Sequence, residues 1–223
     1  MNAVVLDMDE TIGALASFAK YVHEISPYLV TSTLFCHLLD RNPLYLRPGM
    51  LDVLRFLTSN RRLGRCRLIL YTNNPNSHWV KLVRHYLETK GVSFDHVIDG
   101  VDKRRSGLTK CVQDVLECTR LPKNSQFFFV DDQVHPGMVD DRVQYFRIAP
   151  YAEPCEGDLQ PTRELMRHLI SFLQTPPRIA EKAPPCPVRS SAASVWAQGV
   201  ELPRPKSGIE NRKFYPPLSG RPR

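Results

Sequence analysis

Short apolar runs alternate along most of the chain with longer segments in which apolar residues recur at helical spacing. The apolar runs predict five strands, at residues 3–6, 66–71, 94–98, 126–130 and 144–148. The helical stripes predict helices at 14–28, from Pro48 onward, at 79–87, 109–119 and 162–173. Apolar strands that alternate with helices are typical of a parallel sheet covered on both faces. The pattern therefore predicts an α/β fold built on a doubly wound (Rossmann-like) parallel sheet.

Polar residues follow directly after three of the predicted strands. Asp7 and Asp9 come after the first strand, Thr72 after the second, and the pair Asp131-Asp132 after the fourth. In an open α/β sheet the ligand site lies outside the carboxyl ends of the strands, so we expect these side chains to converge. Two pairs of carboxylates and a hydroxyl at one place predict a metal-assisted phosphate site.

The first of these segments predicts both a nucleophile and a general acid. Asp7, the first residue after its strand, is placed to attack phosphorus and form an aspartyl-phosphate. Asp9 is placed to protonate the leaving oxygen and then to deprotonate the water that cleaves the intermediate. We expect Thr11 to hydrogen-bond within the same turn and to help hold Asp9.

The apposed carboxylates need a hard cation, and Mg²⁺ with oxygen ligands is the natural choice. We expect Asp7, the backbone carbonyl of Asp9 and Asp131 to bind it directly. Asp132 is expected to act through a water molecule or a hydrogen bond.

The phosphoryl group needs donors and a positive charge as well as the metal ion. Thr72 and the amide of Asn73 are expected to hold a phosphoryl oxygen. A lysine would screen the charge of the transferring group, and two are candidates. Lys110 is preferred because it opens the helix that leads to the fourth strand, whereas Lys103 stands in the charged run 103–105, which is typical of a solvated loop.

Composition separates the end of the chain from the rest. Ten of the 19 prolines and most of the net charge of +7 lie in 175–223, where no periodicity is found. We therefore expect a folded domain at 1–174 and a Pro-rich, basic, disordered tail at 175–223 that could dock a partner. Because the basic charge belongs to the tail, it gives no reason to expect nucleic acid on the folded domain.

Six cysteines show no C-x-x-C spacing or regular framework, which favours free thiols in a reducing compartment. No apolar run reaches the roughly 18 residues that a membrane span needs. We expect an intracellular protein without a membrane partner, in the nucleus or the cytoplasm.

The motifs that follow the first, second and fourth predicted strands, taken in chain order, resemble those of the haloacid dehalogenase superfamily. Asp7-x-Asp9-x-Thr11 resembles its first motif, Thr72 its second and Asp131-Asp132 its fourth. The intact Asp-x-Asp-Glu-Thr signature resembles the branch of the NIF-like phosphatases and the phosphatases of the RNA polymerase II C-terminal domain. The Arg-Pro-containing segment 46–54 and the segment 71–74 also resemble the corresponding segments of this branch. The resemblance covers roughly residues 1–174.

This resemblance implies a phosphoprotein substrate, with the RNA polymerase II C-terminal domain as one candidate. Segments 12–46 and 74–108 leave no room for a substantial cap domain, and an open site favours a large partner that covers the pocket itself. The chain departs from the branch in two ways. Segment 12–46 has a helical pattern where the branch often has a β-hairpin, and the branch's lysine-aspartate-leucine triplet is missing.

The sequence thus predicts a phosphoric monoester hydrolase: a Mg²⁺-dependent phosphatase of phosphoserine or phosphothreonine in a protein, with an aspartate nucleophile. Two alternatives remain open. The same chemistry could act on a small phosphate ester or on the phosphorylated end of a nucleic acid. The chain could also be a catalytically silent binding module.

Overall fold

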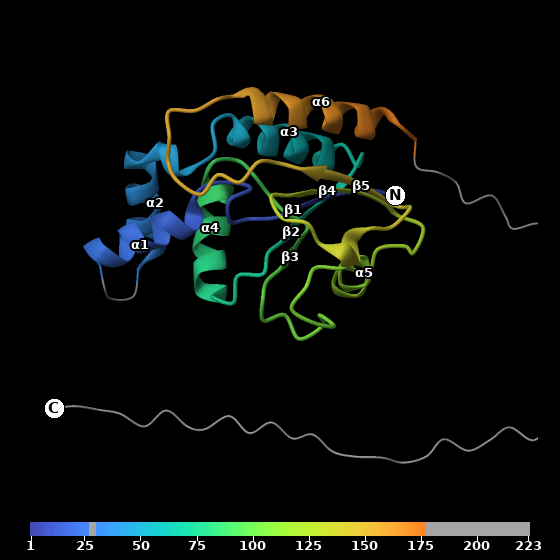
Figure 1. Cartoon of the computed structure of the whole chain (residues 1–223), viewed down its shortest axis with the longest axis horizontal. Coiled ribbons are helices and arrows are strands. Elements are labelled where there is room, and N and C mark those ends of the chain that lie inside the picture. The colour runs from blue at the N-terminus through green and yellow to red at the C-terminus, as the bar shows by residue number, and fades with distance from the viewer. Residues whose placement is uncertain (27–29, 177–223) are drawn as a thin grey trace, which may run out of the picture. The chain divides into compact units, whose positions relative to one another are not determined.

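The computed structural model describes residues 1–26 and 30–176. Its centre is a five-stranded sheet in the order β3-β2-β1-β4-β5, and all four strand pairs are parallel (Figure 1). The strands are β1 (Asn2–Leu6), β2 (Arg67–Tyr71), β3 (His96–Ile98), β4 (Gln126–Asp131) and β5 (Val143–Arg147). All five predicted strands are confirmed, with ends that differ by one or two residues.

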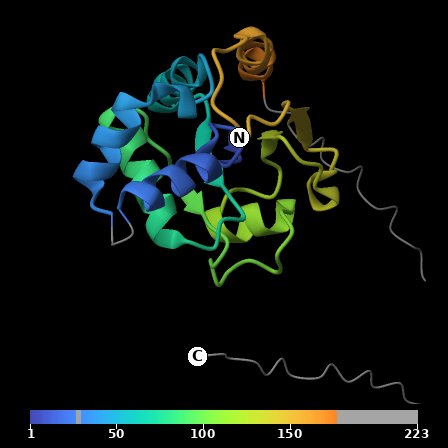
Figure 2. The same ribbon diagram turned by 60° about the vertical axis from the view of Figure 1, so that its left-hand side comes forward.

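Helices connect the strands and cover both faces of the sheet. They are α1 (Leu15–Ile25), α2 (Ser32–Arg41), α3 (Met50–Arg62), α4 (Ser77–Thr89), α5 (Val112–Thr119) and α6 (Gln160–Gln174), with the short 3₁₀ turns η1 (Pro43–Tyr45) and η2 (Pro136–Met138). Figures 1 and 2 show α3 and α6 on one side of the sheet and α5 on the other. The prediction of a doubly wound parallel α/β sheet is confirmed.

The central strands are apolar along their middle residues because both of their faces are buried there. Val4 and Phe128 point into a large core shared with α1, α2, α3, α4 and α6. Their neighbours Val5 and Phe129 point into a smaller core closed by α5. Side chains alternate across a strand, so a continuous apolar run supplies both cores at once.

The segment between the first motif and Arg47 is helical, as the sequence predicted. It contains α1 and also α2, a second helix in the stretch where the sequence pattern was mixed. The two helices pack on α4 through aromatic side chains, with Phe35 edge-on to both Phe18 and Trp79. These contacts explain why α2 was missed: its apolar face fits aromatic neighbours that are distant in sequence.

The remaining helices differ from their predicted bounds at their first turn. α3 begins at Met50, after Gly49 with φ +75°, and not at Pro48. α5 begins at Val112, after Cys111, so Lys110 lies just outside the helix that it was expected to open. Most of the predicted tail, 177–223, lies outside the described residues. In the described part, no helix has both the length and the apolarity to cross a membrane.

Candidate active site

Strand register brings the polar motifs to one edge of the sheet. Leu6, the last residue of β1, pairs with Leu70 of β2 and with Val130 of β4. Asp7 and Asp131, the residues that follow Leu6 and Val130, therefore stand side by side at the carboxyl ends of neighbouring strands. The Asp7 N–H also donates to the Val130 carbonyl oxygen at 2.9 Å, which extends the pairing up to the site.

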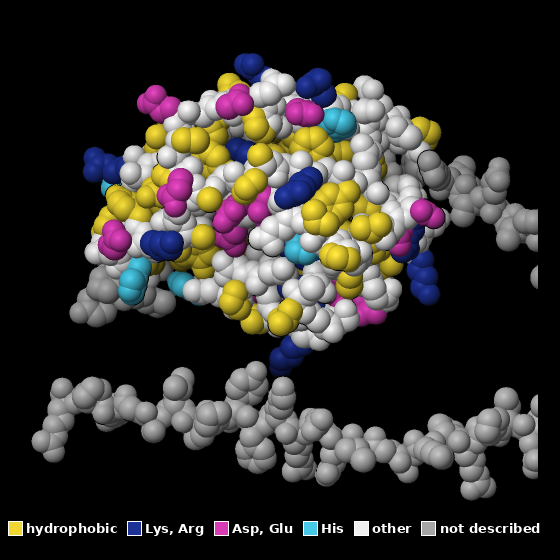
Figure 3. Space-filling view, viewed as in Figure 1, with side chains coloured by type: hydrophobic (Ala, Val, Ile, Leu, Met, Phe, Trp, Pro, Cys, Tyr) yellow, Lys and Arg dark blue, Asp and Glu magenta, His cyan; other side chains and the backbone are white. Residues whose placement is uncertain are grey.

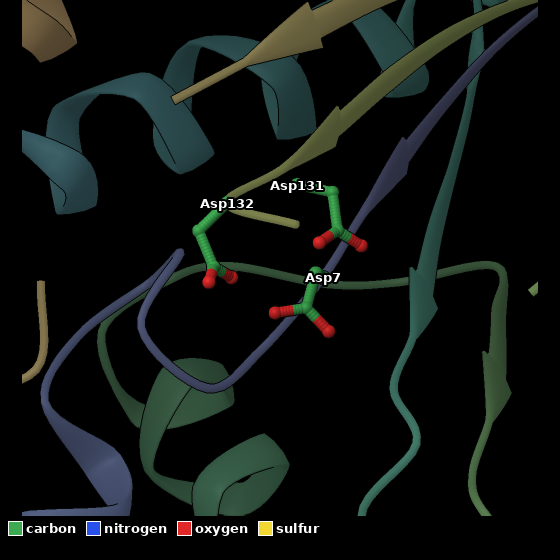
Figure 4. A group of neighbouring side chains, drawn as sticks. All are labelled: Asp7, Asp131 and Asp132. Atoms are coloured by element: carbon green, nitrogen blue, oxygen red, sulfur yellow. The ribbon is translucent and has the colours of Figure 1, made fainter. Parts of the chain in front are cut away.

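Three carboxylates meet at this edge: those of Asp7, Asp131 and Asp132. One oxygen from each lies within 4.8 Å of the others. Figure 4 shows the three side chains pointing into the same space beyond β1 and β4. They are 6 %, 1 % and 5 % exposed, so water screens their mutual repulsion poorly. A group of buried oxygens with this much negative charge fits a hard cation such as Mg²⁺.

Lys110 is the positively charged side chain that contacts these carboxylates. Its Nζ donates to Asp7 and, at 2.7 Å, to Asp131 Oδ2, and the residue is 2 % exposed. The Lys110 Nζ also lies 5.7 Å from the centre of the Tyr71 ring and 5.9 Å from that of the Phe129 ring. Lys103, the alternative, is exposed to solvent. Of the two candidate lysines, the structure therefore brings Lys110 to the carboxylates.

Burial dominates the electrostatics of the carboxylates. It raises the pKa of Asp7 to about 7, with a further increase from the charge of Asp131 and an opposing decrease from Lys110. It also raises the pKa of Asp132, to which the charge of Asp131 contributes. One lysine therefore does not fully offset the cost of burying this negative charge, which is consistent with a site built for a further cation.

Asp9 lies apart from that cluster, toward the end of β2. Its Oδ2 accepts a hydrogen bond from Asn74 Nδ2 at 3.1 Å. Its Oδ1 is buried and has no hydrogen-bond partner among the described residues. Burial raises the pKa of Asp9, which favours the protonated form. One oxygen is thus held in place while the other is free to carry a proton.

Thr72 and Asn73 follow β2 and face the carboxylates. Thr72 is buried, and its Oγ1 accepts from the backbone N–H of Asn74 at 3.0 Å. Asn73 is exposed, and its Oδ1 accepts from Arg105 Nη2 at 2.7 Å. This arrangement leaves the Thr72 hydroxyl hydrogen and the Asn73 main-chain amide as candidate donors to a phosphoryl oxygen.

Thr11 has a different position from the one expected. It is fully buried, and its hydroxyl donates to Asp132 Oδ1 at 3.2 Å rather than hydrogen-bonding within the turn that carries Asp9. The reason is the parallel pairing of β1 with β4, which places the loop after β1 directly against the end of β4. Thr11 therefore fixes the Asp132 carboxylate through this hydrogen bond and does not line the pocket.

A pocket of about 260 Å³ opens in front of these residues. Six residues expected from the sequence line it: Asp7, Asp9, Thr72, Asn73, Lys110 and Asp131. Three more line it that were not assigned to the site: Asn74, Gln133 and His135. The sequence signal for all three is weak, because each stands one to four residues after a motif in a loop without periodicity.

His135 is the most buried of these three, at 6 % exposure. Its Nε2 lies 3.2 Å from Asp131 Oδ2, and its ring meets Phe129 edge-on. Burial lowers its pKa, which favours the neutral imidazole. His135 therefore contacts Asp131 through its buried imidazole.

Two arginines that the sequence left unassigned hold the loops of the site. Arg47 is 4 % exposed and donates to the carbonyl oxygens of Glu10, Thr11 and Ala149. These hydrogen bonds join the loop after β1 to the loop after β5.

Arg105 departs from the prediction that 103–105 is a solvated run, since its side chain is only 3 % exposed. It reaches the end of β2, where it donates to the Thr72 carbonyl oxygen and to Asn73 Oδ1. Arg105 thus fixes the segment that carries two of the expected phosphate contacts.

No protein-family model and no curated protein matches the chain. Among solved structures, the RNA polymerase II CTD phosphatase Fcp1 of fission yeast, a variant bound to beryllium fluoride, is similar with a TM-score of 0.42 and 14 % identity. That match covers 77 % of this chain and 50 % of the other, so the chain spans about half the length of the fission yeast structure. A HAD-superfamily hydrolase of subfamily IA from Geobacter sulfurreducens is similar with a TM-score of 0.40 and 17 % identity, over 78 % of this chain and 96 % of the other.

Apart from these matches, the sequence motifs lie on the sheet where the sequence predicted them to lie. The first, second and fourth motifs stand at the carboxyl ends of β1, β2 and β4, and the lysine lies between them. The motif order and the parallel α/β sheet are those that the sequence resemblance to the haloacid dehalogenase superfamily led us to expect.

Proposed function

We propose that this chain is a Mg²⁺-dependent phosphatase that hydrolyses phosphoserine or phosphothreonine esters in a protein through an aspartyl-phosphate intermediate. The observation that carries the proposal is the cluster of Asp7, Asp131 and Asp132, in which Lys110 binds Asp7 and Asp131 and these three residues line a pocket large enough for a phosphoryl group. A purely structural ion pair would not need three carboxylates for one lysine.

In the first step, an oxygen of Asp7 attacks phosphorus, and the bond from phosphorus to the substrate oxygen breaks. Asp9 gives its proton to that leaving oxygen. Asp9 suits this task because Asn74 holds one of its oxygens while the other has no partner among the described residues. The products are the free alcohol and an aspartyl-phosphate, an acyl phosphate formed on Asp7.

In the second step, Asp9 accepts a proton from water, and the water oxygen attacks phosphorus. The bond to Asp7 breaks, which releases inorganic phosphate and restores the Asp7 carboxylate and the protonated Asp9. Thr72, the Asn73 amide and Lys110 are proposed to hold the phosphoryl oxygens throughout. Bound Mg²⁺, held by Asp7, the Asp9 carbonyl and Asp131, would neutralise charge on the phosphoryl group, with Asp132 as an indirect partner.

A protein substrate is favoured by what borders the pocket. None of the residues that line it comes from α1 or α2, so the helices inserted after the first motif do not roof it. On the face shown in Figure 3, acidic and basic side chains are interspersed, without the basic stripe typical of a surface that follows a nucleic-acid backbone.

The experiment is phosphate release from p-nitrophenyl phosphate and from phosphoserine peptides, with Mg²⁺ and with EDTA. We expect turnover that requires Mg²⁺ and that falls about a thousandfold or more in Asp7→Asn, because the nucleophile is lost. Asp141→Asn is the matched control, since Asp141 is exposed and distant from the motifs. Unchanged activity in Asp7→Asn would contradict the mechanism, and activity confined to small esters or oligonucleotides would contradict the substrate class.

A further inference from the structure

A buried carboxylate that the proposed mechanism does not use lies on α5, outside the phosphate pocket. Asp114 is fully buried, in the first turn of that helix. Burial raises the pKa of Asp114, but hydrogen bonds from Ser106 and Tyr71 outweigh burial and lower the pKa overall, so the carboxylate is ionised at neutral pH. Arg105 Nε, 3.7 Å from Asp114 Oδ2, brings the opposite charge. A charge buried in this way is costly unless its neighbours bind it.

The segment 106–111 brings Lys110 to the carboxylates of the site. It contains no helix or strand, and residues 106–109 are exposed to solvent. Lys110 follows them and is 2 % exposed. The segment has no ladder of backbone hydrogen bonds of its own, so contacts with other elements must fix the point at which the lysine enters the protein.

Asp114 fixes this segment at both of its ends. Its Oδ1 accepts from the backbone N–H of Ser106 at 2.8 Å and from the Ser106 hydroxyl at 2.7 Å. Its Oδ2 accepts from the Tyr71 hydroxyl at 2.8 Å, and the oxygen of that hydroxyl accepts from the Cys111 N–H at 3.3 Å. Asp114 therefore holds Ser106 directly and Cys111 through Tyr71, with Lys110 between the two.

The arrangement differs from an ordinary helix cap. Cys111 is the N-cap of α5, and Asp114 stands at the third helical position. In a capping box, the acidic side chain at that position accepts directly from the N-cap N–H. Here the hydroxyl of Tyr71, the last residue of β2, stands between them. The relay therefore ties the start of α5 to the strand end that carries Thr72.

We propose that Asp114 is a positioning residue for Lys110, which it holds against the carboxylates of the site by fixing both ends of the segment 106–111. The inference rests on the proposed function, in which Lys110 binds the phosphoryl oxygens. Its position matters because a displacement of about 1 Å at a reacting centre is enough to slow catalysis strongly.

The first test measures the position of Lys110 without any turnover. The full chain is treated with acetic anhydride, and the acetylation rate of each lysine is measured by mass spectrometry of its peptides. Tyr71→Phe removes the relaying hydroxyl but keeps the ring. We expect Lys110 to be acetylated about fivefold faster or more in this variant, the factor that corresponds to one hydrogen bond. Lys90, half-buried and paired with Asp40, should keep its rate.

Tyr86→Phe is the matched control for the loss of a buried tyrosine hydroxyl. Tyr86 is 3 % exposed, and its hydroxyl donates to Asp40 Oδ1 at 2.9 Å. Lys90 Nζ pairs with the same oxygen at 2.6 Å. The control should therefore show the opposite pattern, with faster acetylation of Lys90 and an unchanged rate at Lys110.

Asp114→Asn provides a second variant that keeps the shape of the side chain. Its amide oxygen can still accept from Ser106, but its NH₂ group cannot accept from the Tyr71 hydroxyl. The end of the segment at Cys111 is then released while the end at Ser106 stays bound. We expect the same selective rise at Lys110 as in Tyr71→Phe.

The second test is a double-mutant cycle on kcat/KM for p-nitrophenyl phosphate. Tyr71→Phe should lower kcat/KM about fivefold in the wild-type background. In the Lys110→Met background the same substitution should change kcat/KM by less than about twofold, because the group through which it acts is gone. A role confined to the stability of α5 would give the same factor in both backgrounds.

The outcomes separate this inference from the proposed function. A selective rise at Lys110 without turnover by the wild type would overturn the phosphatase and leave the positioning role supported. Turnover by the wild type, with unchanged acetylation of Lys110 in both Tyr71→Phe and Asp114→Asn, would overturn the positioning role alone. Equal rises at Lys110 and Lys90, or a fall in kcat/KM that persists in Lys110→Met, would also overturn it and leave Asp114 as a helix cap.

Discussion

Replacing Arg47 by methionine removes one buried guanidinium that ties three loops together. Its Nε donates to the Thr11 carbonyl oxygen at 2.8 Å, and its Nη2 donates to the Glu10 and Ala149 carbonyl oxygens at 2.6 Å each. Methionine has a similar length and apolar stem but no donor. The substitution therefore deletes the hydrogen bonds while it leaves most of the packing intact.

The size of the expected loss of stability depends on which of the three carbonyl oxygens still accepts a hydrogen bond from another donor. The Glu10 carbonyl also accepts from the Tyr151 N–H at 2.9 Å, so it remains bonded. The Thr11 and Ala149 carbonyls have no other donor among the described residues. A hydrogen bond to a charged group contributes about 1.5–3 kcal/mol, and a buried carbonyl left without a partner costs about 1–3 kcal/mol.

Part of this loss is offset because the variant no longer buries a guanidinium, whose desolvation is the main reason that the pKa of Arg47 is lowered. The net destabilisation is expected to be about 4 kcal/mol, within the range measured when one partner of a buried charged network is removed. A domain of this size is usually stable by about 5–15 kcal/mol, so the variant should still fold.

The assay is urea unfolding followed by far-UV circular dichroism, with the midpoint and the slope fitted separately. Arg47→Met should lower the midpoint strongly with little change in slope. Arg47→Lys should lose less, because it keeps the charge and one donor but not the planar fork. Arg55→Met, on the exposed surface of α3, is the control and should change stability by less than about 0.5 kcal/mol.

A loss below about 1 kcal/mol in Arg47→Met would refute the reasoning, because it would mean that water satisfies the released carbonyls. The same variant should also lower the turnover number for p-nitrophenyl phosphate at temperatures where it is folded. Glu10 and Thr11 follow Asp9 in the loop that carries the proposed acid, so the two effects have one cause.

Three further outcomes are expected. Burial by itself raises the pKa of Asp95, but hydrogen bonds from a backbone N–H and two arginines lower it overall. The ionised Asp95 therefore stabilises the fold above pH about 4, and this stabilisation is lost as the pH falls. Asp95→Asn should flatten this acid dependence of the urea midpoint. Arg120 ends α5 with φ +57°, and Arg120→Gly should raise stability by about 0.5–1 kcal/mol in the same assay, whereas a decrease would show that its side chain contributes more than the backbone conformation costs. A Cβ on Gly13 would lie 2.3 Å from the Tyr45 carbonyl oxygen, so Gly13→Ala should destabilise by about 2 kcal/mol, and a wild-type melting temperature would contradict this close approach.

Much of the scaffold could be predicted because its strands are buried on both faces. Such strands must be apolar at every doubly buried position, as at residues 3–6 and 127–130, and this makes them visible without any partner. Where a strand ends in a parallel sheet, the next side chain lies at the common edge. Asp7 and Asp131 could therefore be expected to meet before any tertiary contact was known.

Other features of the site depend on contacts between segments far apart in the chain. Asn74 and His135 stand in loops whose sequences have no periodicity, so only the folded structure shows that they reach the pocket. Arg105 belongs to a charged run that is typical of solvated loops, yet its side chain is buried against the end of β2. A long polar side chain can be exposed or buried at the same sequence position, depending on which carbonyls its surroundings leave unpaired.

By itself, the sequence determined the order of the five strands and of every helix except α2, the parallel sheet and the carboxylates at its edge, because these follow from local periodicity and from the geometry of parallel strands. The tertiary structure decided which lysine neutralises the carboxylates, that Arg47 is tied to the loops and that Arg105 is buried against the end of β2. Each of these depends on the desolvation and hydrogen-bonding partners of individual side chains, which loops distant in sequence provide and which no local pattern records.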